Sequence, residues 1–541
     1  MGIKRYVANA DNTITNAFNS SLDNDFRATG SNMGRSDILE AFSIYAQVSG
    51  TSTSNFPGRS QELSRLLLKF PVGVFTSDRT KGTIPASGSV SWYLRMFNAR
   101  HGETLPRNYT MTIQAVSRSW EEGDGLDMDN YTDKTYGQYG SNWVTASQGV
   151  AWSAVGGDYH ASPSYTVSFG EKGTEDLKVD ISQLVEEWIA GTKDNYGLGV
   201  RLSPAYEAYF SSSTGQDTGS IVHNTSGAER SYYTKKFFAR ESEYFFKRPI
   251  IEAQWDSTKK DNRGDFYYSS SLAPASDNLN TLYLYNYVRG RLRNIPSVST
   301  GEIYLSLYSG SENNAPNGAK LQLAQGGGVP GPLQTSVTGG YVSTGIYSAS
   351  FAITGGPTII DGLSTTAPAT LNDVWHYSNV EFSTGSIVPK YFNSLDYSDS
   401  STYVVNIKNV KPVYSPDDTA RFRLFVREKN WNPNIYTRAN ASPQTLTIPS
   451  ASYKVIRIAD SYEVISYGTA STPDYTELSY DVSGNYFNLD MSLLQPGYMY
   501  GIKLAFYDDA VLDYREQKIY SKVRIQIKLF PLLILANYPK M

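Results

Sequence analysis

Short segments in which apolar and polar residues alternate recur along most of the chain. In the first region this alternation places Leu66, Leu68 and Phe70 on one side of a segment. A period of two is typical of a β-strand with one buried face. Three further segments follow the same period: Val90, Trp92 and Leu94; Met111, Ile113 and Ala115; and, in the last third, Phe422, Leu424 and Val426. We therefore predict a protein built mainly of β-strands.

One segment departs from this pattern. Its apolar residues are Ile181, Leu184, Val185, Trp188 and Ile189. They fall at i, i+3, i+4, i+7 and i+8, a spacing that predicts a single apolar stripe on a helix. Asp180 stands where an N-cap is expected, and Gly191 where a helix ends. We predict one short amphipathic helix, packed through Trp188 against a sandwich. Glu186 and Glu187 lie away from the stripe, and we expect them in solvent.

Changes in character along the chain predict three domains. A charged, turn-rich stretch at 257–265 separates a first β region from a second, and new alternating strands begin near Val410. We predict domains at 1–256, 257–409 and 410–541. In the last domain a Pro-Gly turn precedes a strand in LLQPGYMYGIKLAF, as in many Ig-like sandwiches. The fold class expected is all-β and multidomain, with tandem β-sandwiches and an Ig-like C-terminal domain.

Composition strengthens this interpretation and excludes several chemistries. The 541 residues include 42 Tyr, 44 Gly and 24 Pro, and aromatic residues make up 13%. Aromatic strands separated by Gly and Pro turns are typical of sandwiches and barrels. There is no cysteine, so disulfides, zinc–thiolate sites and thiol nucleophiles are excluded. A net charge of -4 gives no reason to expect nucleic acid or an anionic membrane as a partner.

Targeting signals are not evident. The first residues, MGIKRYVANADNTITN, lack the apolar core of a signal peptide. The most apolar run, Leu529–Ala536, is much shorter than a membrane span, and we interpret it as a buried terminal strand. Absence of cysteine favours a bacterial or viral source. We expect a soluble protein that is made in a cytoplasm.

An acidic stretch at 121–133 is the candidate metal site. Asp124, Asp127 and Asp129 offer hard oxygen ligands from one glycine-containing loop, which is the donor type that calcium prefers. The spacing is not that of an EF-hand. Two interpretations stay open: a solvated surface loop, which the lack of a motif favours, and a structural Ca²⁺ that fixes a sandwich loop. No other cofactor is expected.

Other chemistry-bearing residues are scattered. The four histidines, at 101, 160, 223 and 376, are isolated, and the carboxylates of Glu121–Glu122 are adjacent rather than convergent. Arg263-Gly264-Asp265 forms an adhesion-type triplet that a domain-boundary turn explains equally well. We therefore predict no catalytic residues and no enzyme. For a group of tyrosines we prefer cross-strand packing over a subunit interface, and a subunit interface over stacking on sugars. The group consists of Tyr267, Tyr268, Tyr283, Tyr285, Tyr287 and Tyr304.

Over residues 60–255 a series of landmarks occurs in a fixed order: LLLKF, IPASGSVSWYLRMF, SWEEG with Trp120, NWV with Trp143, AWSAVGGDY with Trp152, DISQLVEEW, DNYGLGVRL and RPIIEAQW. These ordered landmarks resemble the DNRLRE-type β-sandwich domains, which are related to carbohydrate-binding modules. The resemblance implies a jelly-roll-like sandwich with one short helix. The chain departs from it by an insertion, Ser203–Ser231, just before the closing strand, which puts any ligand site near it in doubt.

Four segments carry a second, looser resemblance: KRYVANADNTITNAF, RSYYTKKFFARESEYFFKRPIIEAQWDS, DNRGDFYYSSSLAPASDNLNTLYLYNYVRG and RFRLFVREKNWNPNIYTRA. Through them the chain as a whole is similar to virion structural proteins of tailed bacteriophages, especially those of large phages of marine bacteria. This resemblance implies assembly into a particle and no need for a signal peptide or disulfides.

We accordingly expect a non-enzymatic structural protein of a phage virion, in the tail, baseplate, neck or fibre, that contacts other virion proteins and copies of itself. The alternatives are a glycan-binding host-attachment protein, with host surface glycan as its partner, and a capsid decoration protein. A tail-spike depolymerase is the last alternative, because no repeat-built β-helix is present. Neither nucleic acid nor membrane insertion is expected.

Overall fold

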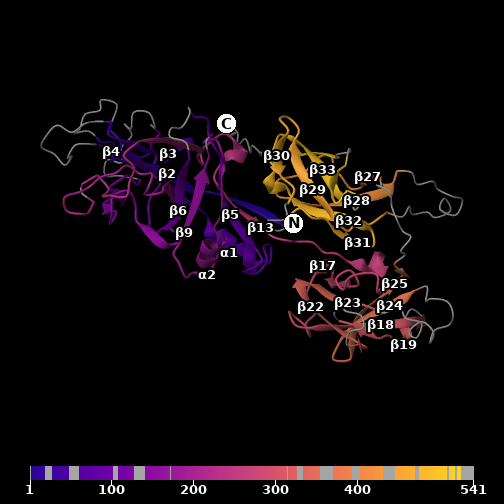
Figure 1. Ribbon diagram of the computed structural model, residues 1–541. Helices are drawn as coiled ribbons and strands as arrows, with labels where there is room; N and C mark the ends of the chain where they lie inside the picture. The colour runs from indigo at the N-terminus through magenta and orange to yellow at the C-terminus, as the bar shows by residue number, and fades with distance from the viewer. Residues whose placement is uncertain are drawn as a thin grey trace, which may run out of the picture. The chain divides into compact units, whose positions relative to one another are not determined.

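The computed structural model describes residues 2–18, 27–47, 60–101, 108–126, 140–170, 172–217, 219–312, 315–325, 333–353, 370–390, 392, 402–429, 445–468, 474–508, 511–517 and 521–525. The chain separates into two compact units, Ile3–Trp255 and Asp256–Met541, the latter together with Met1–Gly2. Each unit is built mainly of β-strands (Figure 1).

Within its described residues, the first unit contains thirteen strands, two α-helices and a short 3-10 helix. These are β1 (Ile3–Val7), β2 (Ala10–Thr15), β3 (Ile38–Tyr45), β4 (Gln61–Lys69), α1 (Val72–Thr80), β5 (Ser91–Met96), β6 (Tyr109–Val116), β7 (Thr145–Ser147), β8 (Val150–Ala151), β9 (Tyr159–Phe169), β10 (Leu177–Asp180), α2 (Ser182–Ala190), β11 (Leu198–Leu202), β12 (Tyr232–Phe238), η1 (Phe245–Lys247) and β13 (Ile250–Gln254).

Two sheets of the first unit enclose its main core. The smaller sheet has the order β1-β13-β5-β10, and the larger has the order β12-β3-β4-β11-β6-β9, with β2 also paired to β4. The predicted alternation is confirmed, because Trp92 and Leu94 of the smaller sheet and Met111 and Ile113 of the larger sheet are all fully buried in this core. The unit is therefore a β-sandwich.

The predicted helix is present as α2, and a second helix, α1, was not predicted. Leu184, Val185 and Trp188 of α2 are buried in the main core, as expected. Gly191 ends the helix in a left-handed conformation with φ 72°. The predicted N-cap is wrong by one residue: the cap position is Ile181, while the Asp180 carboxylate accepts from the Ser182 amide at 2.8 Å.

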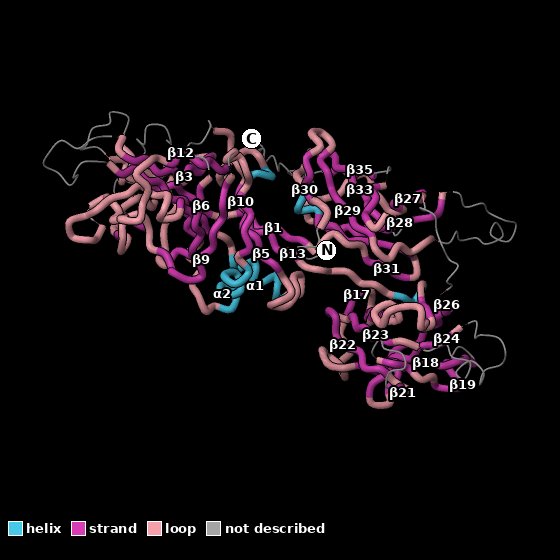
Figure 2. The backbone as a smooth tube through the Cα atoms, in the orientation of Figure 1, coloured by secondary structure: helices cyan, strands magenta, loops and turns pink. Residues whose placement is uncertain are grey.

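The two helices lie side by side (Figure 2). Arg79 of α1 forms an ion pair with Glu186 of α2, and its Nη2 donates to Glu186 Oε1 at 2.7 Å. The Trp92 indole also donates to Glu186, at 3.0 Å. The expectation that Glu186 is merely solvated is therefore wrong, because α1 brings a cation to that face of α2.

The second unit contains the remaining elements. These are η2 (Asn262–Gly264), β14 (Phe266–Tyr267), β15 (Asn280–Tyr285), β16 (Tyr287–Val288), β17 (Arg291–Leu292), β18 (Ile303–Glu312), β19 (Ala315–Lys320), β20 (Leu323–Ala324), β21 (Leu333–Gln334), β22 (Val337–Ser343), β23 (Ile346–Phe351), β24 (Leu371–Tyr377), β25 (Val380–Ile387), β26 (Pro389–Lys390), β27 (Tyr403–Ile407), β28 (Thr419–Glu428), β29 (Ala451–Arg457), β30 (Tyr462–Ile465), β31 (Ser479–Asp481), β32 (Gly484–Asp490), η4 (Met491–Leu493), β33 (Met499–Asp508), β34 (Asp513–Glu516) and β35 (Ser521–Arg524).

The first part of this unit is a curled sheet of order β15-β23-β22-β18-β24-β25. Strand β22 forms its corner: residues up to Gly339 pair with β18, and residues from Gly340 onwards pair with β23. A glycine pair permits such a bend because it carries no side chains that would clash. The two halves enclose a core that includes Leu305, Tyr347 and Trp375.

The second part is a two-sheet sandwich with the orders β27-β28-β32-β31 and β30-β29-β33-β34. Phe422, Leu424 and Val426 of β28 are fully buried, which confirms the predicted inward face. Tyr453 of β29 stacks on Phe487 of β32 with ring centroids 4.3 Å apart, so the two sheets meet through aromatic side chains.

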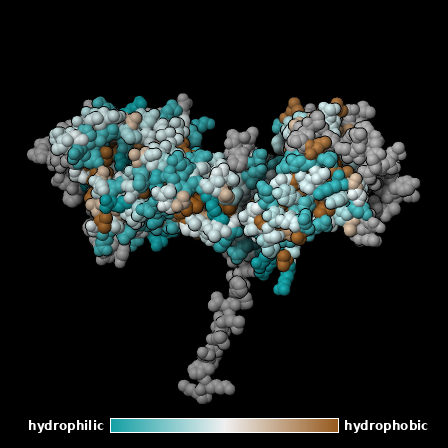
Figure 3. Space-filling view, turned by 90° about the horizontal axis from the view of Figure 1, so that it is seen from below, coloured by the Kyte–Doolittle hydropathy of each residue, from teal (hydrophilic) through white to brown (hydrophobic). Residues whose placement is uncertain are grey.

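The all-β, tandem-sandwich fold class is thus confirmed. None of the helices within the described residues has the length and apolar character needed to span a membrane. The surface seen in Figure 3 is mostly hydrophilic, with small hydrophobic areas scattered over it. The run Leu529–Ala536, interpreted above as a terminal strand, lies outside the described residues.

Candidate functional site

The outer face of the larger sheet in the first unit carries a second core and a buried ion pair. On β4, Leu63, Arg65 and Leu67 point away from the main core, yet all three are buried. Segments that follow β6 and β11 cover them and form a second core on this face. Its buried members are Ile14, Leu63, Leu67, Val116, Trp120, Trp143, Ala146, Trp152 and Ala208.

The three landmark tryptophans all lie in this second core. Each indole N–H donates to a backbone carbonyl: Trp120 to Tyr196 at 2.7 Å, Trp143 to Ser220 at 2.7 Å, and Trp152 to Asn142 at 2.8 Å. A tryptophan that stacks on a sugar must expose a ring face, whereas these rings are at most 6% exposed. They hold the covering segments on the sheet.

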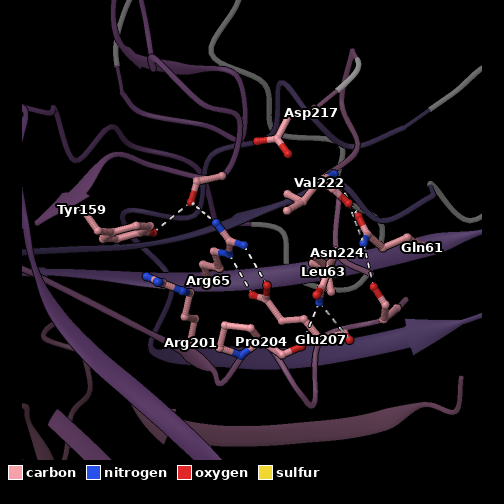
Figure 4. A network of polar contacts seen from close by, with 12 residues as sticks. Gln61, Leu63, Arg65, Tyr159, Arg201, Pro204, Glu207, Asp217, Val222 and Asn224 are labelled. Carbon is pink, nitrogen blue, oxygen red and sulfur yellow. Dashed lines mark hydrogen bonds and ion pairs between the residues drawn. The ribbon is translucent and has the colours of Figure 1, made fainter. Parts of the chain in front are cut away.

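A buried ion pair joins the sheet to the insertion (Figure 4). Arg65 Nε and Nη2 donate to the two carboxylate oxygens of Glu207 at 2.9 and 2.8 Å, and Arg65 Nη1 donates to the Gly156 carbonyl at 3.0 Å. The side chains of the pair are only 8% and 4% exposed. Burial alone would lower the pKa of Arg65, but the Glu207 carboxylate outweighs burial and raises it.

Further polar contacts seal the insertion against β4. The Gln61 amide donates to the carbonyls of Ala208 at 2.8 Å and Val222 at 3.1 Å, and it accepts from the Val222 amide at 3.0 Å (Figure 4). Asn224 donates to the Pro204 carbonyl at 2.8 Å, which closes the insertion on itself. Segment Ser203–Ser231 is therefore a lid that is bonded to the sheet at several points.

Beside the ion pair, a tyrosine fills the space above a glycine. A Cβ on Gly199 of β11 would lie 2.0 Å from the Tyr159 ring, so only glycine fits there. The Tyr159 hydroxyl donates to the Gly156 carbonyl at 2.8 Å, and the Arg201 guanidinium lies over the ring at 4.2 Å from its centroid. Arg201 also donates to the Gln114 side chain at 2.6 Å. Burial raises the pKa of Tyr159.

This arrangement offers little for catalysis or sugar stacking. The Glu207 carboxylate is neutralised by two bonds from Arg65, so it is not available as a general base. The aromatic rings are covered. What the geometry provides is a sheet with packed cores on both faces.

Part of the acidic stretch is hydrogen-bonded to other segments of the first unit. Glu122 accepts from the Asp11 amide at 2.8 Å and from Arg240 Nε and Nη2 at 2.9 Å each. The Asp11 carboxylate accepts from the Arg240 amide at 2.6 Å. Burial raises the pKa of Asp11 to about 7, with a further rise from Glu122. This cluster fixes the start of the acidic stretch.

The candidate calcium ligands are not brought together by what the structure describes. Asp124 is exposed, and Asp127 and Asp129 lie outside the described residues. Within the described part of the chain, no three His, Cys, Asp or Glu side chains are arranged to hold a metal ion. The Asn32 side chain donates to the carbonyls of Glu122 and Ser141 at 2.7 and 2.8 Å, so the two ends of the loop are held together by an amide.

The Arg-Gly-Asp triplet is part of a joint in the second unit. Arg263 forms a bidentate ion pair with Asp373 of β24, with Nη2 and Oδ2 at 2.8 Å, and the Asp265 carboxylate accepts from Lys390 at 2.7 Å. The Asn262 side chain donates to the Tyr480 hydroxyl of β31 at 3.1 Å. The segment 257–265 thereby connects the curled sheet to the C-terminal sandwich, which agrees with the interpretation of the triplet as a turn.

The singled-out tyrosines have different surroundings. Tyr268 is buried in the core of the curled sheet, and Tyr304 stacks on His376 with centroids 6.0 Å apart. Tyr285 of β15 interacts with the Tyr486 hydroxyl of the C-terminal sandwich, and burial raises the pKa of Tyr285. Tyr287 is 57% exposed. Most of the group therefore pack within the chain, as expected.

Sequence reasoning missed Arg65, Glu207 and Gln61. An arginine inside the apolar strand SRLLLKF was the available signal, because a buried guanidinium requires a carboxylate partner. The partner could not be named, since Glu207 lies 142 positions further along the chain.

No family model matches the chain, and no curated protein matches it in sequence. Among solved structures, it is similar to fibronectin(III)-like modules of Clostridium thermocellum CbhA, with 12% identity over 46% of this chain and 85% of that chain and a TM-score of 0.13. It is also similar to a titin Z1Z2 tandem chimera, with 11% identity over 46% and 91% and a TM-score of 0.14. Likenesses at these TM-scores carry no argument about this chain.

Proposed function

We propose that this chain is a non-enzymatic structural component of a tailed-phage virion that acts through contacts with other virion proteins and with copies of itself. The sequence resemblance supplies the class of particle. The observation that supports a structural role is the sealed outer face of the first sandwich. There, the chain's own insertion occupies the surface that a ligand would need.

The charged groups of the first unit support the same proposal. Glu252 is held by Arg5 at 2.6 Å and Arg95 at 3.1 Å, and, despite burial, these two arginines lower its pKa to about 2. Glu252 is thereby fixed in its charged form by its partners. Carboxylates committed to ion pairs stabilise a scaffold, whereas general acids and bases need a pKa near the working pH.

The exposed apolar side chains of the second unit are available for assembly contacts. At the hairpin between β33 and β34, Leu512 is 76% exposed, and Tyr507 and Tyr514 form an edge-to-face pair with centroids 5.3 Å apart. Aromatic side chains combine a large apolar area with a polar tip, which suits protein–protein interfaces. We assign this hairpin to contacts with a neighbouring subunit.

Two measurements test the proposal. Cross-linking mass spectrometry of intact particles should give links from this chain to other virion proteins and to further copies of it. A glycan array probed with the isolated protein should give no binding. Detection of specific glycan binding near micromolar affinity would contradict the structural role and favour host attachment.

A variant pair sharpens the assembly test. Leu512→Asp should reduce incorporation into particles without changing the melting temperature, because the side chain contacts solvent in the isolated chain. Leu272→Asp is the matched control, since Leu272 is equally exposed at 76% but lies in a turn outside the hairpin. Equal incorporation of both variants and the unchanged protein would contradict the assignment of the hairpin.

A further inference from the structure

Lys235 is a buried lysine whose role the proposed function does not explain. It lies on β12, next to a β-bulge, and the residue is 1% exposed. The ammonium lies 4.9 Å from the ring centroid of Phe169 and 5.2 Å from that of Phe237. Lysine is rarely buried, because removing its charge from water is costly.

Three oxygen atoms surround the Lys235 nitrogen. Nζ donates to Asn98 Oδ1 at 2.6 Å, to the Gly173 carbonyl at 2.7 Å and to the Glu175 carbonyl at 2.7 Å. Burial lowers the pKa of Lys235 to about 8, although the charges of Glu175 and Asp176 oppose this change. At pH 7, Lys235 is then a neutral amine in roughly one molecule in ten, a far larger fraction than for a solvated lysine.

The geometry orients that neutral amine. An amine has two N–H donors and one lone pair. When the two backbone carbonyls, of Gly173 and Glu175, accept the two N–H groups, the lone pair is left for the third direction, where Asn98 Oδ1 lies 2.6 Å from Nζ. The amine and the carboxamide are therefore held in contact.

The carboxamide is also held in place. Asn98 follows β5 and pairs with Phe237 of β12, and its backbone amide donates to the Asp176 carboxylate at 2.8 Å. His101 Nε2 lies 3.1 Å from Asn98 Oδ1. In the tautomer that carries a proton on Nε2, this imidazole donates to the oxygen and stabilises the negative charge that develops there during attack.

We propose that Lys235 and Asn98 form an intramolecular isopeptide bond. The ammonium first loses a proton to a carboxylate among Glu175 and Asp176. The amine nitrogen then bonds to the carboxamide carbon of Asn98 and gives up one of its two protons, and the bond from that carbon to Nδ2 breaks. The departing nitrogen takes up the proton that the amine gives up and leaves as ammonia, while the carboxylate keeps the proton from the first step. One amide replaces another, so the step requires no oxidant, reductant or cofactor.

The bond would act as a covalent staple in a chain without cysteine. It would link residues 137 positions apart, joining β12 to the end of β5. Closing a loop of that length reduces the conformational entropy of the unfolded chain, as a disulfide does. Unlike a disulfide, an amide does not depend on the redox state of its surroundings.

Intact-mass measurement of the full-length protein tests the inference. The expected mass is about 17 Da, one ammonia, below that of the sequence. Peptide mapping should yield a branched peptide that contains Lys235 and Asn98. The Asn98→Ala and Lys235→Met variants should show the full sequence mass and no branched peptide.

The outcome does not depend on whether the variants fold, because the unchanged protein decides it. A mass equal to that of the sequence, with the two residues recovered in separate unmodified peptides, would overturn the inference. Lys235 would then be an ammonium held only by its three oxygen partners. Neither result bears on glycan binding or particle assembly, so this test is separate from those of the proposed function.

Discussion

Removal of one partner from the buried pair on the covered sheet tests the account of the first unit. In Glu207→Ala, Arg65 loses the carboxylate acceptors of its Nε and Nη2 groups and keeps the Gly156 carbonyl at 3.0 Å. Its side chain is 8% exposed, so water cannot replace the lost acceptors without opening the lid.

The size of the effect follows from this burial. Breaking a buried ion pair by removing one partner leaves an uncompensated charge and costs about 3–5 kcal/mol. An exposed pair in the same unit provides the control: Arg35 and Glu241 lie 3.2 Å apart with side chains 55% and 33% exposed. Arg35→Ala should cost no more than about 1 kcal/mol, because solvent screens that pair.

Denaturant unfolding followed by tryptophan fluorescence measures the difference in free energy. Of the 8 tryptophans, those at 92, 120, 143, 152, 188 and 255 lie in the first unit, so the signal reports mainly on it. The midpoint should shift strongly for Glu207→Ala and slightly for Arg35→Ala. Equal shifts for the two variants would refute the claim that the lid is bonded in a water-excluded site.

A double variant separates the charge from the packing. Arg65→Met combined with Glu207→Leu removes both charges and keeps apolar volume, so it should cost much less than Glu207→Ala alone. If the double variant is the less stable of the two, the ion pair contributes through its shape and hydrogen bonds rather than through the cost of an unpaired charge.

Three other outcomes are expected. Gly199→Ala should lower the melting temperature, because its Cβ would lie 2.0 Å from the Tyr159 ring. Gly73→Ala in α1 is the control: its Cβ meets no atom within 4 Å, so this variant should raise the melting temperature slightly. Equal melting temperatures for the two variants would contradict the packing of Tyr159 on Gly199. Burial raises the pKa of Asp11 to about 7, above the unfolded value of 3.8. The contribution of Asp11 to the free energy of unfolding is therefore complete below pH 3.8 and is lost as the pH rises through about 7. Asp11→Asn should flatten the pH dependence of the free energy of unfolding over this range. Arg263→Ala should speed limited proteolysis within 257–265 because the joint loses its ion pair to β24, and an unchanged cleavage rate would argue against a clamp.

The local sequence pattern was sufficient to predict the elements that have one apolar and one polar face. The alternation around Trp92 and Phe422 predicted the inward faces, and the stripe through Trp188 predicted α2. Helix α1 was missed because VGVFTSDRT contains a glycine and β-branched residues and has no apolar stripe. It forms because Phe75 fills the space between Tyr6 and Trp92, at 4.3 and 5.3 Å between ring centroids. Such a tertiary contact cannot be seen in a local window.

The sealed sheet face was beyond sequence reasoning for a similar reason. Strand β4 is buried on both sides, so Leu63 and Leu67 look like Leu66 and Leu68 in the sequence. The second core depends on segments far along the chain that return to cover it. The candidate calcium ligands were chosen by residue type and proximity in sequence, and those criteria do not distinguish a metal loop from the acceptor role that Glu122 has beside Arg240.

The pairing of the first and last strands of the first unit determines where the unit yields to force. Strands β1 and β13 run antiparallel, with Ile3 opposite Gln254 and Val7 opposite Ile250. The start of β1 and the end of β13 are therefore neighbours at the same end of the pair. Tension applied through these two points loads the hydrogen bonds one after another, like a zipper, rather than all at once. The strand pair would peel open at low force while β13 stays attached to β5, and the withdrawal of Tyr6 with β1 would open the main core from this edge.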